Sequence, residues 1–157
     1  MRNQSDIYSK LPLLHHSLRY AGYFLIFISL GAVYLYHWGG RPAFFEVPVF
    51  AILTSYAETR WFVFAQTNAL DEIAVISALL GLLFILFAKE KNEIPEMQMM
   101  RFRSLFLSSY ITTILMIIAY ITVYGWPVFI LISFSFIIFL LVSNIIFKMY
   151  ITKYKKI

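Results

Sequence analysis

From Ser104 to Phe147 the chain reads SLFLSSYITTILMIIAYITVYGWPVFILISFSFIIFLLVSNIIF, which is 44 residues without a single Asp, Glu, Lys or Arg. One transmembrane helix needs about 20 apolar residues, so this stretch is too long for one span and suits two. The sequence Tyr124-Gly125-Trp126-Pro127 lies at its middle. Glycine ends helices, proline begins them, and tryptophan and tyrosine favour the membrane–water interface. We therefore expect two antiparallel spans, 104–124 and 127–147, joined by a tight turn at 125–126.

The composition of the whole chain agrees with a membrane location. Of its 157 residues, 61% are hydrophobic and 13% are charged, against about 25% charged residues in a typical soluble domain. So few charges do not cover a soluble surface, which excludes a cytosolic enzyme, a nucleic-acid-binding domain and a secreted disulfide scaffold. The absence of cysteine also excludes disulfides and thiolate metal sites. We expect contact with a lipid bilayer and no nucleic-acid partner.

Two more spans precede the long stretch. Tyr20–Gly40 is free of charge, and its glycine pair predicts a first span over 20–38. Ile73–Ala88 is shorter but reaches spanning length if its charged neighbours lie at headgroup depth, which gives a second span over 70–88 with Asn68 as its N-cap. The predicted fold is an all-α integral membrane protein, one membrane domain with four transmembrane helices.

The basic residues predict the orientation of these spans. Eleven of the 13 Lys and Arg residues lie in segments 1–19, 89–103 and 148–157, and the other two, Arg41 and Arg60, lie in 39–69. Cytoplasmic segments of membrane proteins carry an excess of Lys and Arg. We therefore expect a multi-pass protein of the bacterial cytoplasmic (inner) membrane, with a cytoplasmic tail at each end, a cytoplasmic loop at 89–103 and an extracytoplasmic segment at 39–69.

The extracytoplasmic segment 39–69 is too long for a turn and too polar for a fifth span. Residues 45–53 and 61–65 are rich in β-branched and aromatic side chains, and a polar connector separates them. This pattern predicts a small β-hairpin. An interfacial helix is the alternative, but the charged residues of the segment do not form one polar stripe. A two-stranded hairpin is barely stable alone, so it needs the headgroup layer, the helix ends or a partner to cover it.

Small polar residues recur at helical spacing in the spans. The candidates for helix–helix packing or for a transport pathway are Ser77, Gly81, Ser104, Ser108, Thr112 and Asn144. Small side chains allow helices to approach closely and hydroxyls bond across them, which favours packing. No Asp, Glu, Lys or Arg lies near the centre of a span, which counts against an ion-coupled transporter.

The predicted cytoplasmic loop alternates in charge and contains soft apolar residues. Its candidate partner surface consists of Met97, Met100, Arg101 and Arg103. Methionine-rich surfaces suit protein docking, whereas the simpler alternative places Arg101 and Arg103 against anionic lipid headgroups.

No arrangement of side chains predicts catalysis, a cofactor or a metal site. Asp71 and Glu72 are adjacent carboxylates, but consecutive helical residues point about 100° apart and do not converge on one ion. Their charge suits the positive end of a helix dipole. We expect the protein not to be an enzyme.

Several short runs resemble a known family. They are Asp71-Glu72-Ile73, Gly81-Leu82-Leu83, Lys89-Glu90-Lys91-Asn92-Glu93 and Arg101-Phe102-Arg103-Ser104-Leu105. Over about residues 45–150 the chain resembles an uncharacterised family of small four-span bacterial membrane proteins. The resemblance implies the four-span fold and, through association with a small helix-turn-helix regulator, a signalling role. The chain departs from the family pattern at Arg103, where glutamate is usual, and at Asn144, which is near a usual arginine.

The function expected from these features is that of a non-enzymatic membrane protein acting through protein–protein contacts, regulatory or sensory in nature. The partner would be a membrane or cytoplasmic protein, or a second copy in a homo-oligomer. The alternative is a small-molecule or ion carrier or channel, built from an oligomer of the four-helix bundle and using the Ser104–Thr113 stripe as its path.

Overall fold

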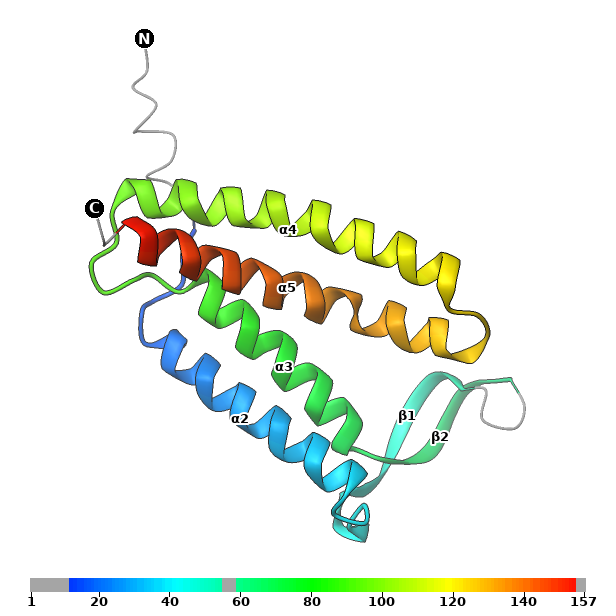
Figure 1. Cartoon of the computed structure of the whole chain (residues 1–157). Coiled ribbons are helices and arrows are strands. Elements are labelled where there is room, and N and C mark those ends of the chain that lie inside the picture. Colours follow the sequence, from blue (N-terminus) through cyan, green and yellow to red (C-terminus); the bar gives the residue numbers. More distant parts are fainter. Residues whose placement is uncertain (1–11, 55–58, 155–157) are drawn as a thin grey trace. The chain divides into compact units, whose positions relative to one another are not determined.

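The computed structural model describes residues 12–54 and 59–154, which form four long helices and a two-stranded hairpin (Figure 1). In chain order the elements are α2 (Leu18–His37), the short helix η1 (Ala43–Phe45), β1 (Glu46–Thr54), β2 (Arg60–Asn68), α3 (Leu70–Phe87), α4 (Pro95–Thr122) and α5 (Trp126–Tyr154). All four long helices are apolar and long enough to cross a bilayer. The predicted fold class is confirmed: this is a multi-pass membrane protein with a hairpin between its first two spans.

The first two spans begin and end close to the ranges expected from the apolar runs. The backbone N–H of Leu70 donates a hydrogen bond of 3.2 Å to Oδ1 of Asn68, so this side chain satisfies one N–H at the start of α3. Asn68 lies one residue before the expected N-cap position, which Ala69 occupies, because the carbonyl of Ala69 accepts from the N–H of Ile73. After α2, Gly40 has a φ of +71°, a conformation that glycine adopts without steric cost.

The last two helices are longer than their apolar runs. Helix α4 begins at Pro95 rather than near Ser104, so residues 95–103, expected in a loop, are helical. Helix α5 continues past Phe147 to Tyr154. Charged residues end the apolar run without ending the helix, because Lys, Arg, Glu and Met are good helix formers. Proline fits the first turn of α4, where its missing N–H costs nothing.

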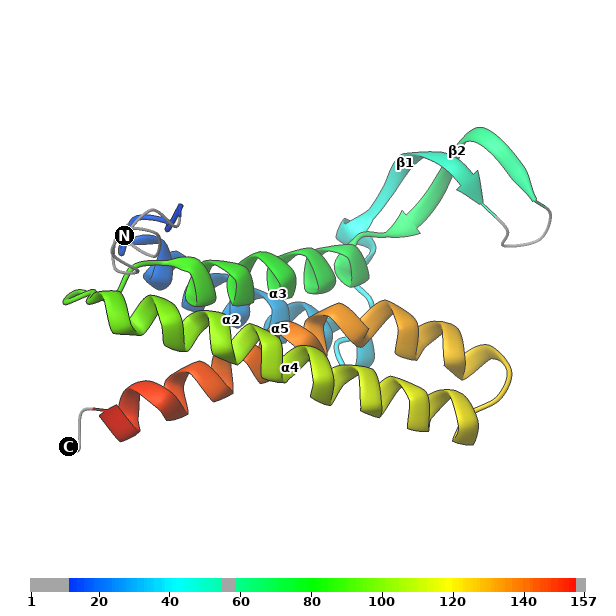
Figure 2. The same cartoon turned by 90° about the horizontal axis from the view of Figure 1, so that it is seen from above.

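Helices α4 and α5 form an antiparallel pair. Gly125, with a φ of +77°, makes the tight turn between them, as the sequence predicted. Figure 1 shows the two helices side by side, and Figure 2 shows them crossing.

The hairpin is antiparallel, with Phe50 opposite Phe64 and Leu53 opposite Trp61. The alternative of an interfacial helix is therefore wrong for this segment, and β2 is longer than the expected 61–65. Alternate residues of β1 are exposed and half-buried, as the pleat of a strand requires. Phe62 has a φ of +51°, an uncommon and strained conformation for an aromatic residue.

The chain folds into two compact units. One holds the residues up to Leu25 together with those from Ala78 onward, and the other holds Ile26–Ser77. In the second unit, Ala32, Leu70 and Ala74 form a buried core against which Phe45 packs. The Ser29 hydroxyl donates to the carbonyl of Ala74 at 2.8 Å, and the N–H of Ala69 donates to the carbonyl of Phe45 at 2.8 Å. The base of the hairpin is thus fixed to the ends of α2 and α3.

Candidate functional site

The end of the first unit that contains the α3–α4 connection holds a buried charge. The side chain of Arg101, in the second turn of α4, is only 2% exposed. Its guanidinium donates to both carboxylate oxygens of Glu93, with Nη1 at 3.0 Å from Oε1, and to the carbonyl of Ala88 at 3.2 Å. It also lies over the ring of Phe147, 4.6 Å from the centroid. A buried charge is tolerated only when it is paired and hydrogen-bonded, and these contacts do both.

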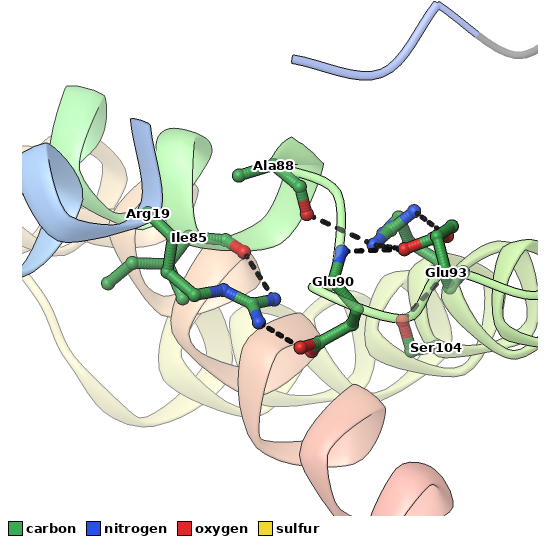
Figure 3. Close-up of polar contacts among 7 residues, drawn as sticks. Arg19, Ile85, Ala88, Glu90, Glu93 and Ser104 are labelled. Atoms are coloured by element: carbon green, nitrogen blue, oxygen red, sulfur yellow. Dashed lines mark hydrogen bonds and ion pairs between the residues drawn. The ribbon is translucent and has the colours of Figure 1, made fainter. Parts of the chain in front are cut away.

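A second ion pair continues from the first. The backbone N–H of Glu90 donates to Oε2 of Glu93 at 2.7 Å, and the carboxylate of Glu90 pairs with the guanidinium of Arg19 in the first turn of α2. Figure 3 shows Arg19 and Glu90 pointing toward each other, with Ile85 beside them. Arg19, Glu90, Glu93 and Arg101, the ion-pair network, tie the starts of α2 and α4 to the segment after α3.

Backbone contacts hold the same end together. The N–H of Leu14 donates to the carbonyl of Phe87, and the N–H of Lys89 donates to the carbonyl of Leu14, each at 3.0 Å. Deeper along the helices, α2 and α3 approach closely at two glycines, Gly22 and Gly81. A Cβ atom on Gly22 would lie 2.8 Å from both the carbonyl oxygen of Gly81 and Cγ1 of Ile85. Only glycine fits at this crossing.

The four residues of the predicted partner surface have different environments. Met97 and Arg101 are buried, Met100 is half-buried, and Arg103 is exposed. The guanidinium of Arg101 therefore contacts the protein itself, and neither a lipid headgroup nor a partner reaches it. Arg103 and part of Met100 are the accessible remainder of this surface.

Three of the small polar residues of α4 lie on its buried face, whereas Ser109 and Thr113 are exposed. Ser104, Ser108 and Thr112 are all buried, and the Ser104 hydroxyl donates to the carbonyl of Arg101 at 2.7 Å. The Ser108 hydroxyl bonds to the hydroxyl of Ser143 on α5. Within the described residues, Oγ1 of Thr112 has no hydrogen-bond partner. Burial and interhelical bonding are properties of helix packing.

The remaining candidate residues bond within one helix or pack between helices. The Ser77 hydroxyl donates to carbonyls of its own helix, those of Ile73 and Ala74. Gly81 packs against α2 as described above. The Asn144 amide donates to the carbonyl of Leu82 on α3 at 3.0 Å, so it links α5 to α3.

A groove opens beside the ion-pair network. It has a volume of about 670 Å³ and lies among the first turns of α2, the last turns of α3 and the C-terminal half of α5. Its polar lining includes Arg19, Glu90, Asn144 and Lys148, and aliphatic side chains form most of the rest. Arg19 and Glu90 were not among the site residues predicted from the sequence. The available signal was their opposite charge at the ends of two spans that an antiparallel arrangement brings to the same membrane face.

The second unit presents an exposed aromatic surface on the hairpin. Phe50, Phe62 and Phe64, here named the aromatic face, are 56%, 68% and 75% exposed. The ring of Phe50 lies 5.4 Å from that of Phe64 and 6.4 Å from that of Phe62, centroid to centroid, so the three rings gather on one side of the sheet. Ile52, at 62% exposure, lies on the same strand two residues after Phe50.

No group of three or more His, Cys, Asp or Glu residues in the described part of the chain is arranged to hold a metal ion. Asp71 and Glu72 are both exposed in the first turn of α3, where their charge suits the helix dipole. Comparisons with protein-family models, with curated proteins and with solved structures find no match to this chain.

Proposed function

We propose that this chain is a non-enzymatic membrane protein that acts through protein–protein contact, and that the aromatic face of the hairpin makes the contact. The observation that carries the proposal is the exposure of Phe50, Phe62 and Phe64, each by more than half, on a sheet with only two strands. The partner that suits this face is the extracytoplasmic part of another membrane protein, with an apolar surface of its own.

The aromatic face is expected to be covered by a protein partner. A lone two-stranded hairpin is marginal in water, and contiguous exposed apolar side chains mark interaction sites. Aromatic residues contribute most at the centre of protein interfaces, because they bury a large area at low cost in conformational entropy. Among the residues that the structure describes, each strand pairs with one other strand, so an extended segment of a partner could pair along its outer edge by main-chain hydrogen bonds.

The base of the hairpin is anchored to the helices. Its base is joined to the core of Ala32, Leu70 and Ala74 through Phe45. The strained φ of Phe62 lies within the aromatic face, and strained backbone tends to gather at binding sites.

The distribution of basic residues supports the side on which this contact occurs. Eleven Lys and Arg residues lie in the segments placed in the cytoplasm and two lie in the hairpin segment. Both termini then lie in the cytoplasm, and the hairpin lies outside a bacterial cytoplasmic membrane. A contact outside the membrane and basic segments inside it are compatible with the regulatory or sensory role that we propose.

The other expected functions have less support. Three of the seven charged residues of the 89–103 segment, Glu90, Glu93 and Arg101, pair within the chain. Of the predicted partner surface, this leaves Arg103 and part of Met100 for a cytoplasmic partner. The carrier or channel alternative relied on the hydroxyls of α4, and those of Ser104 and Ser108 bond within the protein.

Photo-crosslinking tests the proposal. A photoreactive phenylalanine analogue at Phe64 is expected to give a discrete protein adduct in intact membranes. The same analogue at Phe106, which is 54% exposed on α4, is the matched control and is expected to react with lipid. The pair Phe50→Ser and Phe64→Ser is expected to abolish stoichiometric co-purification of the adduct protein without loss of helix content. Lipid adducts alone at both positions would contradict the proposal.

A further inference from the structure

The groove of about 670 Å³ beside the ion-pair network joins a charged end to an aliphatic wall. We propose that it binds one anionic phospholipid, with the phosphate near Lys148 and Arg19 and an acyl chain along Leu82, Ile85 and Ile145. The observations that carry this are the unused positive charge, the depth of the polar end in the bilayer, and the apolar lining.

The groove has one more positive charge than negative charge. Arg19 and Lys148 line it together with a single carboxylate, that of Glu90, which pairs with Arg19. No carboxylate in the part of the chain that the structure describes pairs with Lys148. Lys148 is exposed on α5, so the phosphate of a lipid in the groove can reach its ammonium group and supply the missing negative charge.

The charged end lies at the depth of lipid phosphates. Lys148 follows Pro127, at the start of α5, by 21 residues. That is about 32 Å along a helix axis, close to the ~30 Å thickness of the hydrocarbon core. Arg19 in the first turn of α2 and Glu90 just after α3 lie at the same end. Basic pockets between helices at this depth on the cytoplasmic side bind anionic headgroups.

The aliphatic wall selects a lipid over a free anion. Leu141 and Ile145 precede Lys148 on α5 by up to two turns, so they lie deeper in the hydrocarbon region, and Leu82 and Ile85 face the same groove from α3. The amide of Asn144 is engaged by the carbonyls of Leu82 and Leu140, so it leaves the lower groove apolar. An acyl chain fills such a surface, and inorganic phosphate does not.

Native mass spectrometry of the full chain, released from membranes of phosphatidylglycerol and phosphatidylcholine in equal amounts, tests the proposal. The wild-type protein is expected to retain one phosphatidylglycerol. Lys148→Gln is expected to lower that retention about tenfold, whereas Lys153→Gln, which removes the same charge from α5 outside this groove, is expected to change it less than twofold.

A second variant separates the groove from general surface charge. Ile145→Trp places a larger side chain in the aliphatic part and leaves every charge in place, so it is expected to lower retention of phosphatidylglycerol as well. Equal losses in Lys148→Gln and Lys153→Gln, or full retention in Ile145→Trp, would overturn the proposal. Competition by glycerol phosphate as effective as that by the lipid would also overturn it, because the site would then recognise a free anion.

Discussion

Arg101 connects several segments of the first unit. Its guanidinium contacts the carboxylate of Glu93, the carbonyl of Ala88 just after α3, and the ring of Phe147 on α5. A charge removed from water depends on such partners, and removing one partner leaves the other charge buried and unpaired. Arg101 is therefore expected to contribute strongly to the stability of this end of the protein, beside the Arg19–Glu90 pair.

We expect Arg101→Gln to lower the free energy of unfolding by roughly 3 kcal/mol, because the half-buried carboxylate of Glu93 loses its charged partner. Arg103→Gln, two residues away and exposed, is expected to change it by about 0.5 kcal/mol or less. Denaturant titration in mixed micelles, followed by circular dichroism, measures both values. Similar losses of unfolding free energy for the two variants would show that the buried contacts of Arg101 do not add to stability.

The sequence alone does not show which of Arg101 and Arg103 is buried. Both basic residues belong to the same run, but residues two apart on a helix point about 200° from each other. Arg101 is the buried one because its partners Glu93, Ala88 and Phe147, which lie outside α4, surround that side of the helix. A charge run alone therefore predicted a surface where the structure has an internal ion pair.

At the scale of elements, α2 packs through one of its two helical glycines. A Cβ on Gly22 would meet the carbonyl of Gly81 and the side chain of Ile85 at 2.8 Å, whereas a Cβ on Gly31 would meet nothing within 4 Å. In a membrane, where apolar surface alone does not drive association, such close backbone approach is a main source of helix packing.

Gly22→Ala is expected to destabilise the protein by roughly 1–3 kcal/mol, because α2 and α3 must separate to admit the methyl group. Gly31→Ala introduces the same methyl group into open space and is expected to be neutral or to stabilise by up to about 1 kcal/mol. Thermal unfolding in one detergent compares the pair. Equal effects would mean that helix propensity, and not packing, sets the result.

The hydroxyl stripe of α4 gives a further prediction at this scale. Oγ1 of Thr112 is buried and has no hydrogen-bond partner among the described residues. Thr112→Val keeps the shape and removes the unsatisfied hydroxyl, so we expect stability to be unchanged or to rise by about 1 kcal/mol. Ser143→Ala breaks the bond to Ser108 and is expected to cost about 0.6 kcal/mol. Loss of stability in Thr112→Val, measured by the same unfolding assay, would show that this hydroxyl has a partner in the membrane.

The elements that the sequence predicted best are those set by local patterns. Apolar run length located the four spans, glycine and proline located the turn at Gly125, and β-branched residues located the hairpin. The ends of α4 and α5 were missed because hydropathy marks where a helix leaves the hydrocarbon and not where its hydrogen bonds stop. The groove and the ion-pair network were missed because they join residues far apart in the chain, such as Arg19 and Glu90.

At the scale of the whole molecule, four helices are apolar and long enough to cross a bilayer. In the topology that we propose, α2 and α3 each cross the membrane once, so the hairpin between them lies on one side and the ion-pair network lies on the other. The absence of cysteine makes single-site labelling direct. Gln66 on the hairpin and Lys91 between α3 and α4 are both exposed, so cysteines there are accessible.

The most direct test is labelling of Gln66→Cys and Lys91→Cys in intact bacterial cells with a membrane-impermeant maleimide. The proposed topology predicts that Gln66→Cys is labelled at once and that Lys91→Cys is labelled only after the cells are permeabilised. Labelling of both from the same side, or labelling of Lys91→Cys alone in intact cells, would contradict it.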